Sequence, residues 1–128
     1  MSKKSSKTKK DTNQKPQDKR CKLLIIGAGP GGYVCAVRAG QLGVDTIIVE
    51  REKLGGTCLN VGCIPSKALI HGAHDYYTLV KAAENRSGMG ITAKTPKLNL
   101  KEMISWKDGI VSRLNSGVSS LLKKSNVK

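Results

Sequence analysis

The hydrophobic residues fall into short clusters whose spacing changes along the chain. Residues 22–26 and 44–49 are compact apolar runs, typical of strands that are buried on both faces of a sheet. Between them, residues 33–42 have the spacing of an amphipathic helix, which Gly43 ends. The pattern predicts a strand, a turn, a helix and a second, parallel strand joined by a right-handed crossover.

The pattern becomes helical beyond the second strand. Residues 51–56 are predicted to form a loop, and a helical segment is predicted to start near Thr57. Gly62 and Pro65 should disturb that helix before it resumes over residues 66–84, because glycine and proline both disfavour the helix interior.

A linker over residues 85–95, with or without one short strand, precedes a second long helix. Asn99 followed by Glu102 is a helix N-cap signature. Six apolar residues beyond it have approximately helical spacing: Leu100, Ile104, Ile110, Leu114, Val118 and Leu121. Residues 126–128 are predicted to enter a further strand. Since two parallel strands do not make a stable sheet alone, the predicted fold class is α/β, the incomplete opening part of a Rossmann-type parallel sheet.

Charge divides the chain into two parts. The 128 residues carry 23 Lys and Arg against 9 Asp and Glu, a formal charge of +14. Residues 1–20 hold eight of those bases with almost no apolar residue, which predicts a disordered leader ahead of one domain at 21–128. A polyanion-binding arm is the alternative interpretation of the leader.

Targeting signals and cysteine usage favour the cytoplasm. No apolar run is long enough to span a bilayer, and no apolar core follows the leader lysines as in a secretory signal. The aromatic side chains of Tyr76, Tyr77 and Trp106 are too few and too scattered for a base-stacking platform, so no nucleic-acid partner is expected. In that compartment a C-x4-C pair indicates a catalytic or metal-binding role rather than a structural disulfide.

The turn after the first strand has the pattern G-x-G-x-x-G at Gly27, Gly29 and Gly32. Such glycines make a tight turn, let a pyrophosphate approach the backbone and allow close helix packing. Glu50 ends the second strand, where a carboxylate can bind the ribose hydroxyls of a dinucleotide without a 2′-phosphate. A glycine-rich surface turn followed by an ordinary acidic residue is the alternative.

Cys58 and Cys63 form the second motif. On a regular helix residues five apart have Cα atoms about 8.6 Å apart, beyond the roughly 4.4–6.8 Å of a disulfide. If the two form a disulfide, the helix must be distorted between them, as Gly62 and Pro65 permit. A position near a helix start, with Lys67 close by, predicts a lowered pKa for Cys58.

Two alternatives stay open for the cysteine pair. Both thiols can be inert, or they can join two histidines in a zinc set, although the spacing fits finger-type sites poorly. The histidines are otherwise ordinary helix positions, and Cys21 and Cys35 are interpreted as structural. The zinc set comprises Cys58, Cys63, His71 and His74.

Together the motifs closely resemble the N-terminal portion of the dihydrolipoamide dehydrogenases, within the flavin-dependent pyridine nucleotide-disulfide oxidoreductase family. The resemblance runs from about residue 22 to residue 128. Its most specific part is residues 55–69, GGTCLNVGCIPSKAL, and residues 34–43 and 106–109 are similar as well.

The resemblance implies an FAD site and a redox-active disulfide. Cys58 is then the thiol that meets dihydrolipoamide, Cys63 lies against the flavin ring, and Lys67 sits near that ring. Electrons pass from dihydrolipoamide to the disulfide, then to FAD and then to NAD. The implied FAD-binding residues besides Lys67 are Gly27, Gly29, Pro30, Gly31, Gly32, Glu50, Arg51, Gly56 and Thr57.

The resemblance also implies a lipoyl-bearing carrier protein of a 2-oxoacid dehydrogenase complex as partner, and a homodimer. Members of the family carry a second glycine motif for NAD, a segment that closes the FAD domain, and a dimerisation domain. These 128 residues contain none of them, so incomplete turnover is expected of this chain alone. Another flavin disulfide reductase, such as a mercuric reductase, and a non-catalytic remnant are the alternatives.

Overall fold

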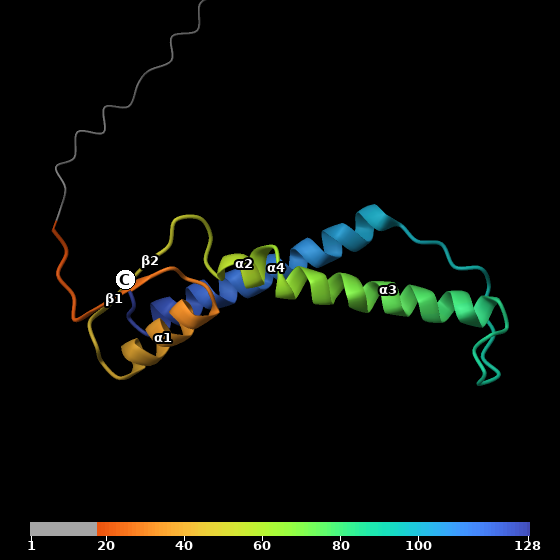
Figure 1. Ribbon diagram of the computed structural model, residues 1–128, viewed down its shortest axis with the longest axis horizontal. Helices are drawn as coiled ribbons and strands as arrows, with labels where there is room; N and C mark the ends of the chain where they lie inside the picture. The colour runs from red at the N-terminus through yellow and green to blue at the C-terminus, as the bar shows by residue number, and fades with distance from the viewer. Residues whose placement is uncertain (1–17) are drawn as a thin grey trace, which may run out of the picture.

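The computed structural model describes residues 18–128, so most of the expected leader lies outside the described residues. Residues 18–20 are exposed and belong to no helix or strand. Two strands and four helices follow in the order strand, helix, strand and three helices (Figure 1). They are β1 (Leu23–Ile26), α1 (Pro30–Gln41), β2 (Thr46–Val49), α2 (Gly56–Asn60), α3 (Cys63–Ala83) and α4 (Leu100–Lys124).

The two strands form the parallel pair that the hydrophobic pattern predicts. Leu23 lies opposite Thr46, and Ile26 lies opposite Val49. On the other edge of β2, Lys128 donates its N–H to the Thr46 carbonyl at 3.0 Å and accepts the Ile48 N–H at 2.7 Å. These two bonds are those of a parallel ladder. They place residue 128 beside β2, but residues 126–128 belong to no strand of the described structure, so a further strand stays a prediction.

The burial of the strands differs from the prediction. Only one face of the sheet is covered, by α1 and α4, where Ile25 and Ile48 pack against a core of Ala36, Val118 and Leu122. On the opposite face Leu24 is 55% exposed and Ile26 is 84% exposed. The expectation of strands buried on both faces is therefore wrong for the described residues, because both covering helices lie on the same side.

Helix α1 begins three residues before its predicted start, because Pro30 occupies the first turn, where a missing N–H costs nothing. Its end agrees with the prediction, since Gly43 follows with a φ of +74°. Near that end α1 touches the end of α4. A Cβ on Gly40 would lie 2.1 Å from the Ser125 carbonyl oxygen, so only glycine allows this approach.

Helices α3 and α4 pack against each other; α3 runs away from the sheet and α4 runs back toward it (Figure 1). The predicted cap is confirmed, because Asn99 Oδ1 accepts the Glu102 N–H at 3.3 Å at the start of α4. The linker between the helices contains no strand. Within residues 18–128, no helix is both long and apolar enough to cross a membrane.

Candidate functional site

The glycine turn connects β1 to α1 through backbone contacts alone. Gly27 adopts a φ of +96°, which disfavours any residue with a side chain, and its N–H donates to the Val49 carbonyl at 2.7 Å. A Cβ on Gly32 would lie 1.9 Å from the Gly27 carbonyl oxygen. The first glycine therefore shapes the turn, and the third lets the helix pack directly on it.

The start of α1 is open to a ligand. Gly29 is the N-cap and Pro30 follows, so no side chain accepts the first N–H groups of the helix. Cβ atoms built on Gly27, Gly29 and Gly31 would meet nothing within 4 Å. Unpaired N–H groups and free space at a helix N-terminus suit the phosphates of a dinucleotide.

Glu50 holds this turn to the loop that follows β2. Its Oε2 accepts the Ala28 N–H at 2.8 Å, and its Oε1 accepts the Glu52 N–H at 2.9 Å. Hydrogen bonds from the backbone N–H of Glu52 and then of Ala28 hold the pKa of the Glu50 carboxyl below its ordinary value. The carboxylate is thus fixed, charged, beside the turn.

A second pair of glycines brings the cysteine segment onto the first turn. The Gly55 N–H donates to the Ala28 carbonyl at 2.8 Å. Gly56 has a φ of +59°, and a Cβ there would lie 2.8 Å from the Gly29 Cα. Helix α2, which carries Cys58, begins at this contact, so its position is fixed by the glycine turn.

The helix is broken between the two cysteines, as a close pair requires. Helix α2 ends at Asn60 and α3 begins at Cys63, with Gly62 at its N-cap. Contrary to the prediction, Pro65 does not disturb α3. It lies in the first turn of the helix, where proline is tolerated. All four cysteines of the chain are free thiols.

The pKa of the Cys58 thiol is raised, opposite to the prediction. The main cause is the hydrogen bond with the Cys63 thiol, and partial burial adds to it. The Cys63 backbone N–H and the Lys67 charge lower the pKa, as expected, but they do not compensate. The sequence argument was wrong because it left out the effect of one thiol on the other.

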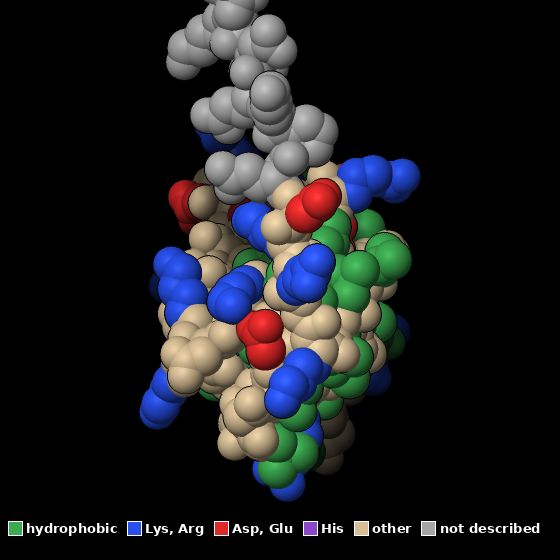
Figure 2. Space-filling view, turned by 90° about the vertical axis from the view of Figure 1, so that its left-hand side faces the viewer, with side chains coloured by type: hydrophobic (Ala, Val, Ile, Leu, Met, Phe, Trp, Pro, Cys, Tyr) green, Lys and Arg blue, Asp and Glu red, His purple; other side chains and the backbone are tan. Residues whose placement is uncertain are grey.

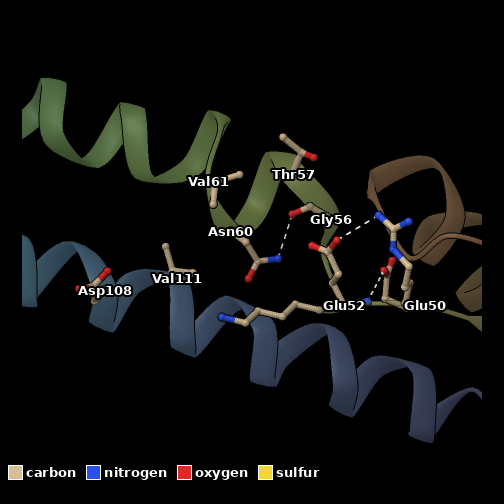
Figure 3. A pocket seen from close by; sticks show the side chains of 10 residues that line it. Glu50, Glu52, Gly56, Thr57, Asn60, Val61, Asp108 and Val111 are labelled. Carbon is tan, nitrogen blue, oxygen red and sulfur yellow. Dashed lines mark hydrogen bonds and ion pairs between the residues drawn. The ribbon is translucent and has the colours of Figure 1, made fainter.

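A cleft of about 690 Å³ lies between the loop after β2, helix α2 and helix α4 (Figure 3). It gathers four of the predicted cofactor-binding residues, Glu50, Arg51, Gly56 and Thr57. The glycine turn, the cysteine pair and Lys67 do not line it. The other lining residues are Glu52, Lys53, Asn60, Val61, Asp108 and Val111.

The sequence argument overlooked the contribution of α4 to this site. Asp108 and Val111 reach the cleft from α4, and Asn60 reaches it from between the cysteines (Figure 3). Asn60 could have been singled out from the sequence, because asparagine is a poor helix former and here stands between two apolar residues, Leu59 and Val61. Asp108 and Val111 carried none, since only the tertiary packing brings them here.

The two histidines lie further along α3 and do not join the cysteines. His71 Nε2 lies 3.6 Å from an Asp75 carboxylate oxygen, and its ring lies 6.4 Å from that of Trp106. Within residues 18–128, no three His, Cys, Asp or Glu side chains gather as a metal site. The zinc set of the alternative interpretation is therefore not assembled.

Sequence relatives share most of this chain. It is 58% identical over 105 residues to the dihydrolipoyl dehydrogenase of Pseudomonas aeruginosa, covering 82% of this chain and 22% of that protein. The dihydrolipoyl dehydrogenase of Bacillus subtilis is 50% identical over 104 residues, covering 81% of this chain and 21% of that one. The chain thus spans about a fifth of the length of these relatives.

A solved structure shares the fold. The Cu(II) complex of the HOCl-induced flavoprotein disulfide reductase RclA from Escherichia coli superposes with a TM-score of 0.63 at 25% identity. The match covers 84% of this chain and 21% of that one. A sequence model described as pyridine nucleotide-disulphide oxidoreductase matches residues 21–128, the whole of the part that follows the leader. On that match and on the relatives' identity, the chain belongs to the pyridine nucleotide-disulphide oxidoreductase family.

Proposed function

We propose that this chain supplies the FAD-binding turn and the redox-active cysteine pair of a dihydrolipoyl dehydrogenase. In the proposed reaction the two thiols of dihydrolipoamide attack and open a Cys58–Cys63 disulfide. Lipoamide leaves with its sulfurs joined, and the cysteines keep the two electrons as thiols. Bound FAD supplies the next acceptor of those electrons, and NAD is the final one.

The observation that carries the proposal is the contact between the two motifs. Gly55 and Gly56 rest on Ala28 and Gly29, so the segment with both thiols starts at the candidate phosphate-binding turn. A redox pair that exchanges electrons with a dinucleotide needs this proximity. The influence of the Cys63 thiol on the pKa of the Cys58 thiol supports the same role, because a pair that closes reversibly must lie close together.

FAD fits the residues that are present. The open N-terminus of α1 would hold its pyrophosphate, and the charged Glu50 would accept hydrogen bonds from its ribose hydroxyls. Each carboxylate oxygen of Glu50 accepts one backbone N–H, which leaves lone pairs for the ribose. We assign Gly27, Pro30, Gly31, Gly32, Arg51, Thr57 and Lys67 to the same site.

The same proposal extends to partners and location. A lipoyl-bearing carrier protein of a 2-oxoacid dehydrogenase complex would present the substrate to Cys58, in the cytoplasm and within a homodimer of the longer enzyme. The relatives' identity of 50–58% favours this branch over a metal-directed flavin reductase, since the RclA structure shares only 25%. Mercuric reductase activity without lipoamide dependence would contradict the choice.

Flavin binding by the 128-residue chain is the first test. The purified chain should be yellow, or should quench FAD fluorescence on titration, and should keep flavin through gel filtration. With FAD bound, dihydrolipoamide added without oxygen should bleach the flavin absorbance in the wild type but not in Cys58→Ser. A folded chain that stays colourless and binds no FAD would instead favour a non-catalytic remnant.

A further inference from the structure

A polar contact ties the segment between the two cysteines to helix α4. Asn60 Nδ2 donates to the Leu54 carbonyl oxygen and to the Gly56 carbonyl oxygen, each at 2.9 Å; Figure 3 shows the bond to Gly56. Asn60 Oδ1 accepts from Asn115 Nδ2 at 2.8 Å, across 55 residues of sequence. One amide side chain therefore joins the loop before α2, the first residue of α2 and the middle of α4.

The direction of these bonds is fixed by the donors and acceptors available. Both carbonyl oxygens can only accept, so they require the NH₂ end of Asn60, and its oxygen must face Asn115. Asn115 must then present its own NH₂ group. As a result its Oδ1 is buried with no hydrogen-bond partner among the described residues. Burying an acceptor in this way costs free energy.

The contact between Asn60 and Asn115 lies next to the helix break that sets the relative position of the two thiols. Helix α2 has only five residues, too few to persist without tertiary contacts, and Asn60 is its last residue. The break that brings Cys63 to Cys58 begins at the next residue, Val61. A freed Asn60 would release the end of α2 and enlarge the range of positions open to Cys58.

We propose that Asn60 and Asn115 are positioning residues, which hold the segment so that the Cys58 and Cys63 thiols meet and thereby favour closure of the disulfide. The inference rests on the proposed redox role of the pair. It adds a determinant on α4, outside the motif that carries the cysteines.

The closure reaction is thiol–disulfide exchange with oxidised glutathione as the oxidant. One cysteine thiolate attacks the glutathione disulfide and releases one glutathione thiol. The other cysteine attacks the mixed disulfide and releases the second. The glutathione S–S bond is broken and the Cys58–Cys63 bond is formed, and the two electrons and two protons end on glutathione.

The test is the equilibrium constant of this exchange, measured on the full chain without FAD by trapping thiols at set glutathione ratios. Asn115→Asp keeps the shape but places a carboxylate against Asn60 Oδ1. Asn115→Leu removes the donor and also the unpaired oxygen. Both should lower the constant for disulfide formation by roughly three- to tenfold, the loss of about one hydrogen bond.

Ser116→Ala is the matched control, because Ser116 is next in sequence and its hydroxyl donates to the Ser112 carbonyl within α4. It should leave the constant unchanged. Circular dichroism reports folding of each variant. A folded Asn115→Leu with a wild-type or higher constant overturns the proposal, and so do variants that are both unfolded, since the contact is then structural.

The test separates this inference from the proposed function. If the wild-type chain forms only mixed disulfides with glutathione and never an internal one, the redox role itself fails. If it closes normally and the Asn115 variants close equally well, only the positioning role fails. Flavin binding has no part in either measurement.

Discussion

The two turns that meet at this site are built in different ways. The glycine turn depends on side chains that are missing: Gly32 and Gly56 each let two backbone segments approach to distances that a Cβ forbids. The cysteine segment depends on side chains that are present, because Asn60 and Asn115 hold it with hydrogen bonds. The first turn should therefore fail when a Cβ is added at Gly32 or Gly56, and the second when its hydrogen-bond donors and acceptors change.

The largest expected effect comes from Gly32→Ala. The new Cβ would lie 1.9 Å from the Gly27 carbonyl oxygen, so the backbone must shift, and we expect a loss of about 3 kcal/mol or more in the free energy of unfolding. Urea denaturation measures it. The control is Gly31→Ala in the same helix turn, where a Cβ meets nothing within 4 Å and should be neutral or stabilise by up to about 1 kcal/mol. Equal stability of the two variants would contradict the comparison.

Glu50→Gln tests the one side chain on which the glycine turn does depend. Since the pKa of Glu50 is lowered in the fold, its stabilisation is complete above the ordinary carboxyl pKa and is lost as the pH falls through the lowered pKa. The variant should lose this part of the acid dependence of the melting temperature and bind FAD about tenfold more weakly. Glu52→Gln, whose side chain is 75% exposed, should behave as the wild type.

Cys63→Ala tests the electrostatics of the cysteine segment. Because the Cys63 thiol is the main cause of the raised pKa of Cys58, its removal should lower that pKa, while Lys67 and the backbone N–H at residue 63 remain. Thiolate absorbance during a pH titration reports the change. In the control, Cys35→Ala, the Cys58 titration should stay where it is. An unchanged or higher pKa in Cys63→Ala would show that burial controls the thiol.

Asp45→Asn should have the smallest effect on stability, because Asp45 lies outside both turns. Lys128 Nζ lies 2.9 Å from Asp45 Oδ1 at the surface, and this carboxylate raises the pKa of Lys128. The pair therefore stabilises at neutral pH and is lost as the pH rises through the raised pKa of Lys128. Exposed ion pairs contribute little, so the variant should change the melting temperature least of the four. A loss of stability comparable to that of Gly32→Ala would mean that the fold depends on the contact between Lys128 and Asp45.

The sequence predicted what depends on local chemistry. The order β1, α1 and β2, the turn at Gly27 and the cap at Asn99 follow from signals within a few residues of each other. The sequence-based prediction failed for features that depend on contacts between segments far apart along the chain. The bond between Asn60 and Asn115 joins residues far apart in sequence, and the exposure of Ile26 depends on which face the helices cover.

The error over the thiol has the same origin at a shorter range. The expected lowering of the Cys58 pKa considered a helix start and Lys67, which are both sequence neighbours. The opposing effect needed the distance between two sulfurs, and that distance depends on the break at Val61 and Gly62. The spacing of the two cysteines requires a break in the helix if they are to meet, but it does not predict how the two thiols then affect each other.

The face of the sheet that no described helix covers should affect the tendency of this chain to self-associate. Leu24, Ile26 and Val49 present apolar surface beside an end that carries many Lys and Arg side chains (Figure 2). Two copies can hide this surface by meeting face to face, and the net charge of +14 opposes the encounter. At 0.1 M ionic strength the repulsion is screened beyond about 10 Å. Added salt should thus promote self-association of this chain, whereas low salt should keep it dispersed.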